Sequence, residues 1–123
     1  TAVWASALAS PAWSGPPVWL HGDLRPGNFL ARAGRLSAVI DFGLLGVGDP
    51  ATDVMAAWLF LTAETRDLFR TALQVDDATW ARGRGWALNF GVMALPYYQK
   101  SNPALAAIAH RVIEETLMDY LLY

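Results

Sequence analysis

Apolar residues recur at two spacings along this chain, and the spacing predicts which segments form helices and which form strands. The second half has apolar positions three and four residues apart, the period of an amphipathic helix. The first half holds short apolar runs bounded by glycine and proline, which is typical of strands and loops. We expect helices over residues 1–10, 51–62, 64–74, 77–100 and 104–122, and strands over 18–20, 29–31 and 36–40.

Turn and cap residues mark where several of these elements begin. The last two strands are joined at Ala33-Gly34, which predicts a hairpin whose second arm ends at Asp41. Asp49 followed by Pro50 predicts a helix start, because it offers a side-chain acceptor at the N-cap and proline at the first helical position. Asp76 is expected to cap a later helix. The resulting fold class is α+β and mainly helical.

The same periodicity assigns side chains to the core or to the surface. The strand at 18–20 is expected to be buried, and the helix at 77–100 is expected to bend where glycines and Pro96 interrupt it. The residues assigned to the core include Leu68, Phe69, Leu73, Trp58, Trp80, Trp86, Phe90 and Met93. The residues assigned to solvent are Arg66, Asp67, Arg70, Glu114, Glu115 and Asp119, with attraction of a cationic substrate as the alternative for the last three.

Composition and charge narrow the class of protein. The chain has 123 residues, of which 54% are hydrophobic, enough for the core of one domain. Its formal net charge of -2 gives no basic field, so we expect no nucleic-acid partner. The absence of cysteine excludes disulfides and thiolate chemistry. No apolar run reaches the ~20 residues that span a bilayer, so we expect a cytoplasmic protein with no membrane partner.

Two short loops carry the residues on which a functional prediction rests. The first, His21 to Asn28, places the carboxylate of Asp23 five positions before the carboxamide of Asn28. The second, Asp41-Phe42-Gly43, follows the predicted hairpin. Kinases have the same order, with a catalytic-loop aspartate, an asparagine five positions on, and then a metal-binding Asp-Phe-Gly. The two loops therefore predict phosphoryl transfer.

Each of these side chains suits one task in that reaction. Phosphoryl transfer needs an acceptor hydroxyl in line with the γ-phosphate of ATP, and oxygen ligands for Mg²⁺. Asp23 is expected to orient and deprotonate the hydroxyl as the catalytic base. Asn28 and Asp41 are expected to bind Mg²⁺ and, through it, the nucleotide. Arg25 is a further catalytic candidate, because its guanidinium can stabilise charge on the transferring phosphoryl group.

The stretch HGDLRPGN, followed by VIDFG and GDPATD, resembles the aminoglycoside phosphotransferase family, which is similar to choline and ethanolamine kinases. The resemblance extends over nearly the whole chain. It implies the helical C-terminal lobe of a protein-kinase-like fold, with a small β-hairpin that carries the catalytic and metal loops. It also implies a small-molecule kinase that uses ATP and Mg²⁺. Many members have a histidine where this chain has Arg25.

Three further residues are assigned supporting roles. His21 is expected to hold the catalytic loop by hydrogen bonds rather than to carry a proton. Asp49 and Asp53 are expected to cap a helix and brace a loop, with metal binding as the alternative for both. Gly22 stands where many protein kinases have an arginine that binds the phosphate of a phosphorylated activation loop. Because only Leu44 to Val47 separates the second motif from the third, we expect a small-molecule hydroxyl acceptor rather than a protein.

The parts of a kinase that clamp the nucleotide do not occur in this sequence. No Gly-rich phosphate loop precedes His21, and the sole lysine is Lys100, downstream of both loops. We therefore expect residues 1–123 to form the C-terminal catalytic and substrate lobe of an enzyme. The N-terminal ATP-binding lobe is expected to be a missing partner, without which this fragment is inactive.

The leading hypothesis is ATP- and Mg²⁺-dependent phosphorylation of a hydroxyl on an aminoglycoside-like antibiotic, an amino alcohol or a sugar. GTP is an alternative donor. A catalytically silent binding or regulatory module is the alternative function, although the intact Asp23, Asn28 and Asp41 argue against it. A metal-dependent phosphohydrolase would use similar carboxylates, but it leaves the Asp-Phe-Gly unexplained.

Overall fold

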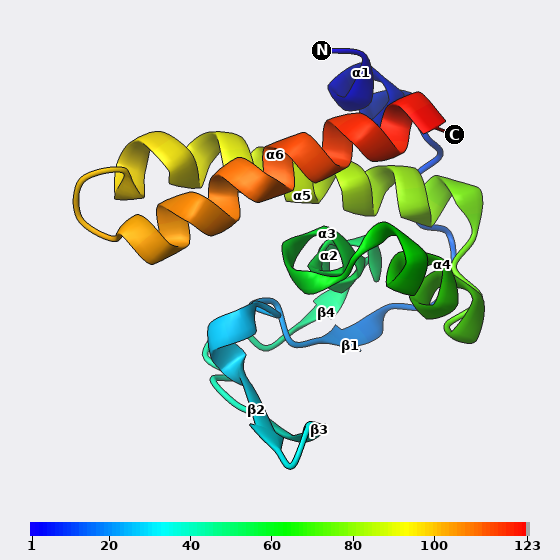
Figure 1. The fold of residues 1–123 in the computed structure, drawn as a ribbon. Coiled ribbons are helices and arrows are strands. Elements are labelled where there is room, and N and C mark those ends of the chain that lie inside the picture. The colour runs from blue at the N-terminus through cyan, green and yellow to red at the C-terminus, as the bar shows by residue number, and fades with distance from the viewer. Residues whose placement is uncertain (123) are drawn as a thin grey trace.

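Two long helices, α5 and α6, run side by side as an antiparallel pair, and shorter helices separate them from the strands (Figure 1). In this computed structural model, residues 1–122 are described. Helix α1 packs against α5 on the side away from the strands. The helices are α1 (Ala2–Ala9), α2 (Ala51–Val54), α3 (Ala56–Phe60), α4 (Ala63–Ala72), α5 (Asp77–Tyr98) and α6 (Pro103–Leu122).

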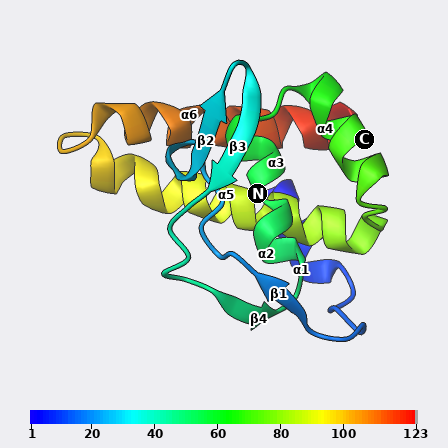
Figure 2. The ribbon, with the colours of Figure 1, turned by 90° about the horizontal axis from the view of Figure 1, so that it is seen from below.

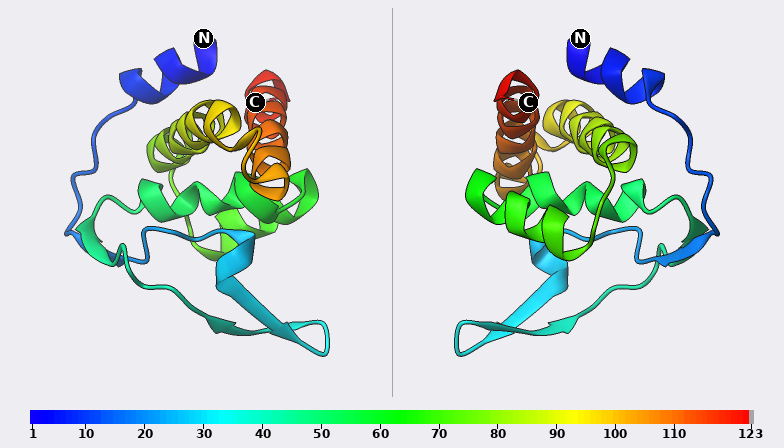
Figure 3. Two further views of the ribbon diagram at one scale, coloured as in Figure 1. Left: turned by 90° about the vertical axis from the view of Figure 1, so that its left-hand side faces the viewer. Right: turned by 90° about the vertical axis from the view of Figure 1, so that its right-hand side faces the viewer.

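The strands form two separate antiparallel pairs rather than one sheet. Strand β1 pairs with β4, and β2 pairs with β3 as the predicted hairpin. The hairpin projects away from the helices, as both side views show (Figure 3). The strands are β1 (Val18–Leu20), β2 (Phe29–Arg32), β3 (Arg35–Val39) and β4 (Gly46–Gly48). The predicted class, α+β and mainly helical, is confirmed.

The core lies where α2 and α3 meet α5 and α6. Trp58 is fully buried, and its ring centroid is 4.6 Å from that of Trp80, which is also buried. Val112 on α6 completes this cluster. The prediction that these two tryptophans are core residues is confirmed. The same prediction for Trp86 is wrong, because 46% of this residue is exposed.

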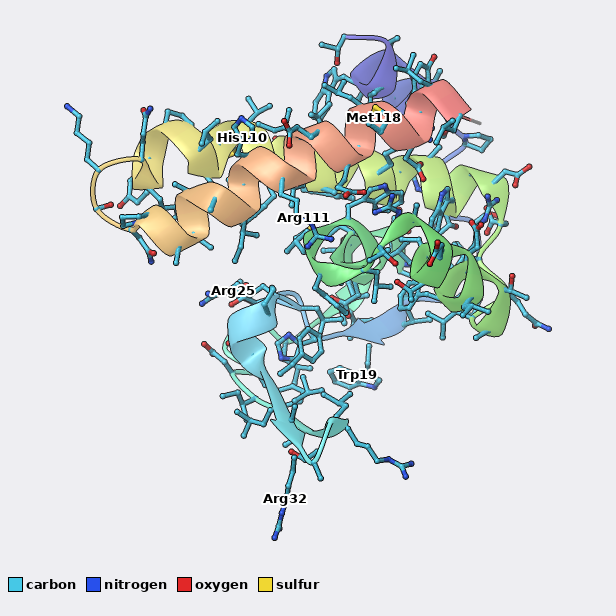
Figure 4. All side chains as sticks on the ribbon, in the orientation of Figure 1. Trp19, Arg25, Arg32, His110, Arg111 and Met118 are labelled. Atoms are coloured by element: carbon cyan, nitrogen blue, oxygen red, sulfur yellow. The ribbon has the colours of Figure 1, made fainter. Side chains whose placement is uncertain are left out.

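Two expectations about local structure need correction. Trp19 on β1 is 76% exposed, and its ring points away from the helices (Figure 4). Among residues 1–122 the strand pairs with β4 alone, which leaves the Trp19 side chain uncovered. The helix expected at 51–62 is divided at Met55, where the amide of Trp58 bonds to the Met55 carbonyl in a tight i+3 turn.

One charged residue of α4, Arg66, is turned inward, contrary to prediction, whereas Asp67 is exposed as predicted. Arg66 is only 3% exposed, whereas Leu68 is 70% exposed. Arg66 Nη1 lies 2.8 Å from a carboxylate oxygen of Glu115, and Asp119 pairs with both Arg66 and the buried Arg84. These ion pairs neutralise charges that would otherwise be costly to bury. Asp119 therefore belongs to the interior and not to a solvated face.

The glycines of α5 mark close helix contacts. A Cβ at Gly85 would lie 2.4 Å from the Cβ of Ala7 on α1. A Cβ at Gly91 would lie 2.7 Å from Ile113 Cγ1 on α6. Helix α5 is continuous through these positions and through Pro96. Among the described helices, none has the length and apolar character that crossing a membrane requires.

Candidate active site

The two predicted loops lie side by side because both of their ends are fastened by strand pairing. The first loop connects β1 to β2, and the second connects β3 to β4. Pairing of Leu20 with Gly46 joins the loops at one end, and pairing of Phe29 with Val39 joins them at the other. Figure 2 shows the two connections running between the strand pairs. Two antiparallel ladders thus bring together segments that are separate in the sequence.

Ile40 links the two loops through both of its backbone polar groups. Its amide donates to the carbonyl of Asn28 over 2.9 Å. Its carbonyl lies 2.8 Å from His21 Nε2. Asp41 follows Ile40 directly, so these bonds place Asp41 beside the catalytic loop.

Both ring nitrogens of His21 contact backbone groups. The amide of Asp23 donates to Nδ1 over 3.1 Å, so Nδ1 is an acceptor and the ring proton resides on Nε2, which donates to Ile40. The residue is 7% exposed, and the ring of Phe42 lies 4.6 Å away between centroids. These contacts fit the predicted support role and leave neither nitrogen free to exchange a proton with a substrate.

Asp53, on α2, binds the start of the first loop. Its Oδ2 accepts from the amide of His21 over 2.7 Å, and its Oδ1 accepts from the amide of Gly22 over 2.9 Å. Hydrogen bonds to a carboxylate are stronger than those between neutral groups. Both carboxylate oxygens are therefore used to hold backbone, which fits the predicted bracing role rather than metal binding.

Gly22 occupies a backbone conformation that other residues rarely adopt. Its φ is 84°, and a Cβ there would lie 2.4 Å from the carbonyl oxygen of Leu44 in the second loop. Sequence reasoning noted only that this position lacks an arginine. The structure adds a steric reason for glycine, since the two loops touch at this point.

The side chain of Asp23 is held by its neighbours within the first loop. Asn28 Nδ2 donates to the Asp23 carbonyl over 2.8 Å and to its carboxylate over 3.1 Å. Arg25 Nε lies 3.2 Å from the other carboxylate oxygen, and its side chain extends outward from the loop (Figure 4). Asn28 is only 4% exposed and belongs to a short 3₁₀ turn, Pro26–Asn28. The carboxylate is thus fixed in direction while Asp23 itself stays partly open to solvent.

The donor atoms near Asp41 suit a magnesium ion that is shared with phosphates. Asp41 is exposed, with φ 61°, and the amide of Gly43 bonds to its Oδ1 over 3.4 Å. Both side-chain hydrogen bonds of Asn28 use its nitrogen, so its oxygen is left for another partner. Within residues 1–122, no three His, Asp or Glu side chains form a metal cluster. Magnesium commonly takes one or two protein oxygens and completes its shell with phosphates and water, so this donor set fits.

Asp49 is engaged away from the loops. Its Oδ1 accepts from the amide of Ala51 over 2.9 Å, and Arg82 Nε lies 2.8 Å from its Oδ2. Burial alone would raise the pKa of this carboxyl, but the hydrogen bonds from Arg82 and Ala51 outweigh it and hold the pKa below 3.8. Arg82 also bonds to the carbonyl of Pro11, which ties the N-terminal segment to α5. Helix α2 begins at Ala51, as predicted, although its N-cap residue is Pro50 and not Asp49.

A pocket of about 450 Å³ opens beside the catalytic loop. It lies between Gly22, the α2 region and one face of α5. Sequence reasoning missed this feature, because it assigned Phe90 and Met93 to the core, whereas Met93 is 66% exposed. The lining residues are Gly22, Thr52, Met55, Trp86, Asn89, Phe90, Met93, Ala94, Tyr97 and Tyr98.

Comparison of the sequence with known protein families gives a match, and it includes the two loops. Residues 1–86 match the family model described as APH, the phosphotransferase enzyme family. The match covers more than half of the chain and includes both loops. No curated protein and no solved structure matches the chain. The family implies phosphoryl transfer and a kinase-like fold, so the resemblance seen in the sequence is confirmed for residues 1–86. The chain belongs to the APH phosphotransferase enzyme family.

Proposed function

We propose that this chain is the catalytic and acceptor-binding lobe of a kinase that transfers a phosphoryl group from ATP to a hydroxyl of a small molecule. The observation that carries the proposal is the fixed Asp23 carboxylate, which Asn28 holds by a hydrogen bond while His21 and Asp53 hold backbone amides of the same loop. Family membership supports the reaction class. A carboxylate held in one direction at an open loop suits a base that must meet a hydroxyl.

Asp23 is the catalytic base in this proposal. It accepts a hydrogen bond from the acceptor hydroxyl, aligns the oxygen for attack, and takes the proton as the new phosphorus–oxygen bond forms. Asn28 keeps the carboxylate in place through its 3.1 Å hydrogen bond. Arg25, now ion-paired with Asp23, stabilises charge on the transferring group in this proposal.

Asn28 and Asp41 hold the metal and, through it, the nucleotide. Magnesium, when bound, neutralises charge on the β- and γ-phosphates. Asn28 offers its free side-chain oxygen, and Asp41 offers an exposed carboxylate at the end of the hairpin. The Ile40 hydrogen bonds keep these two positions adjacent. Nucleotide clamping is assigned to an N-terminal lobe outside this chain, with ATP as donor and GTP as the alternative.

The acceptor is a small molecule in this proposal. The segment between the metal loop and β4 is short, and the amide of Leu45 bonds to the carbonyl of Phe42 in a tight turn. Such a segment offers no long activation loop on which a protein substrate could dock. The pocket of about 450 Å³ beside Gly22 is within the usual size of a small-molecule site.

Phosphate transfer by the full-length gene product that contains this chain tests the proposal. The protein is incubated with Mg²⁺, ATP or GTP, and a panel of hydroxyl compounds, and ³¹P NMR detects the phosphorylated acceptor. Transfer should stop when EDTA removes the metal. Asp41→Asn should raise the Mg²⁺ concentration needed for half-maximal rate, whereas Glu64→Gln, at an exposed position on α4, should leave it unchanged.

Two outcomes would contradict the proposal. Transfer that persists in EDTA would show that the reaction needs no metal ion at Asn28 and Asp41. Nucleotide binding without transfer to any acceptor in the panel would favour a catalytically silent binding module instead.

A further inference from the structure

The pocket beside the catalytic loop contains no charged side chain. Its lining residues with polar side-chain atoms are Thr52, Asn89, Trp86, Tyr97 and Tyr98, and the rest are apolar. The inference drawn from it rests on the proposed function, because it concerns what the acceptor is. An uncharged, apolar lining selects a ligand by burial of apolar surface and a few hydrogen bonds.

One wall of this pocket is a stripe along α5. Trp86, Phe90, Met93 and Tyr97 are spaced four, three and four residues apart, which places them on one face of the helix. At about 1.5 Å per residue the stripe is about 16 Å long. Trp86 is 46% exposed and Tyr97 75%, so their rings are open to a ligand. We call these four residues the α5 aromatic wall.

The shape of the wall argues against a compact cation as ligand. An aromatic cage for a quaternary ammonium needs several ring faces within about 6 Å of one point. In the α5 aromatic wall the side chains follow one another along a helix instead. The rings of Tyr97 and Tyr98 meet edge-on, 4.8 Å apart, at one end of the pocket. An extended ligand can contact the whole wall, whereas a small cation can contact only part of it.

The distribution of carboxylates argues against a polycation. A separate pocket of about 720 Å³ between α4 and α6, which no catalytic-loop residue lines, is bordered by acidic side chains of both helices. The pocket beside Gly22 has none. A polycationic ligand moved into an uncharged, aromatic pocket would lose hydration without gaining ion pairs.

We infer that the acceptor is a neutral hydroxyl compound with an extended apolar or aromatic body, which lies along the α5 aromatic wall. Thr52 and Asn89 supply uncharged hydrogen bonds that orient it. Its hydroxyl end lies toward Gly22, next to Asp23 in the sequence. The hydroxyl oxygen bonds to the γ-phosphorus, the bond from that phosphorus to the β-γ bridging oxygen breaks, ADP leaves, and Asp23 takes the proton.

Binding measured without nucleotide tests the ligand class separately from the reaction. Isothermal titration calorimetry on the full-length gene product compares 2-(naphthalen-2-yl)ethanol, a neutral aromatic alcohol, with the polycation kanamycin and the quaternary ammonium choline. Only the naphthyl alcohol should bind with saturation. Met93→Glu places a charge on the wall and should weaken this binding at least about tenfold.

Val92→Glu is the matched control. Val92 is the neighbouring residue on α5, is 57% exposed, and does not line the pocket. It should leave binding of the naphthyl alcohol unchanged. Because Met93 and Val92 are both exposed, neither variant should lower the melting temperature by more than a few degrees.

Four results would overturn the inference. They are saturable binding of kanamycin or choline in competition with the naphthyl alcohol, failure of the naphthyl alcohol to bind, equal weakening in both variants, and a dimer in sedimentation that Met93→Glu dissociates. The last would make the wall a surface for self-association. If the alcohol binds as expected but Mg-ATP phosphorylates nothing in the panel, the ligand class stands and the proposed reaction fails. If a polycation is phosphorylated instead, the reaction stands and the ligand class fails.

Discussion

Removal of the Asp53 carboxylate tests how the catalytic loop is held. In the structure this side chain accepts the amides of His21 over 2.7 Å and Gly22 over 2.9 Å. Asp53→Ala leaves both amides without their acceptor, in a position that is only partly open to water. The loop that carries Asp23 then loses its fixed starting point. We therefore expect both a loss of stability and a loss of turnover.

The size of the stability loss follows from the two hydrogen bonds. A hydrogen bond to a charged group contributes about 1.5 to 3 kcal/mol, so two would give about 3 to 6 kcal/mol. Water can reach a partly buried amide, and a hydrogen bond to water offsets part of the free energy lost with each bond to Asp53. We therefore expect the free energy of unfolding to fall by about 2 to 4 kcal/mol. Asp53→Asn, which keeps one acceptor oxygen, should lose less than Asp53→Ala.

Urea denaturation of the full-length gene product measures the loss, and the rate of phosphoryl transfer is measured on the same samples. Glu64→Ala is the control, because it removes an exposed carboxylate that makes no described hydrogen bond or ion pair. It should change the free energy of unfolding by less than about 1 kcal/mol. Equal losses in Asp53→Ala and Glu64→Ala, together with unchanged turnover, would refute the bracing role.

Three further perturbations test other parts of the structure. Gly22→Ala should destabilise the protein by more than about 2 kcal/mol in urea denaturation and should slow turnover, because φ is 84° and the new Cβ would lie 2.4 Å from a backbone oxygen. A loss below about 0.5 kcal/mol would contradict the close contact between the two loops. Asp76→Ala should cost about 1 kcal/mol, because Asp76 accepts the Thr79 amide over 2.8 Å at the start of α5; no loss of helix stability in thermal melts would count against this cap. For Asp49 the folded-state pKa lies below 3.8, so its stabilising contribution is complete above that pH and is lost as the pH falls through the folded value. The difference in unfolding free energy between wild type and Asp49→Asn should therefore be constant from pH 7 to 5 and shrink below about pH 4, and a difference independent of pH would show that the ion pair with Arg82 contributes nothing.

Features set by neighbouring residues were predicted well from the sequence. The hairpin turn at Ala33-Gly34 and the cap at Asp76 depend on residues a few positions away, and both are present. The two loops were recognised because residue type and order are enough to indicate their chemistry. The role of Asp53 in bracing was also expected from its motif, although its partners, His21 and Gly22, could be named only once the chain was folded.

Features that depend on which helix packs against which were not predictable in this way. Arg66 was assigned to solvent because it is charged, yet it is buried against Glu115 and Asp119 from a helix far along the chain. Met93 was assigned to the core because it is apolar, yet its face of α5 is left open beside the catalytic loop. Helical periodicity identifies the faces of a helix but not their partners. The Met93 error concerns the pocket that we propose as the acceptor site.

The turnover of Asp23→Asn tests the central claim most directly. The full-length gene product and the variant are compared at saturating ATP, Mg²⁺ and acceptor. Under these conditions a difference in rate reports the loss of the base and not weaker substrate binding. Asparagine has the same shape and can still accept the hydrogen bond from Asn28. The account predicts that kcat falls about 10²- to 10⁴-fold while the free energy of unfolding changes by less than about 1 kcal/mol. A kcat within a few-fold of the wild type, in a variant equally stable, would contradict the assignment of Asp23 as the base.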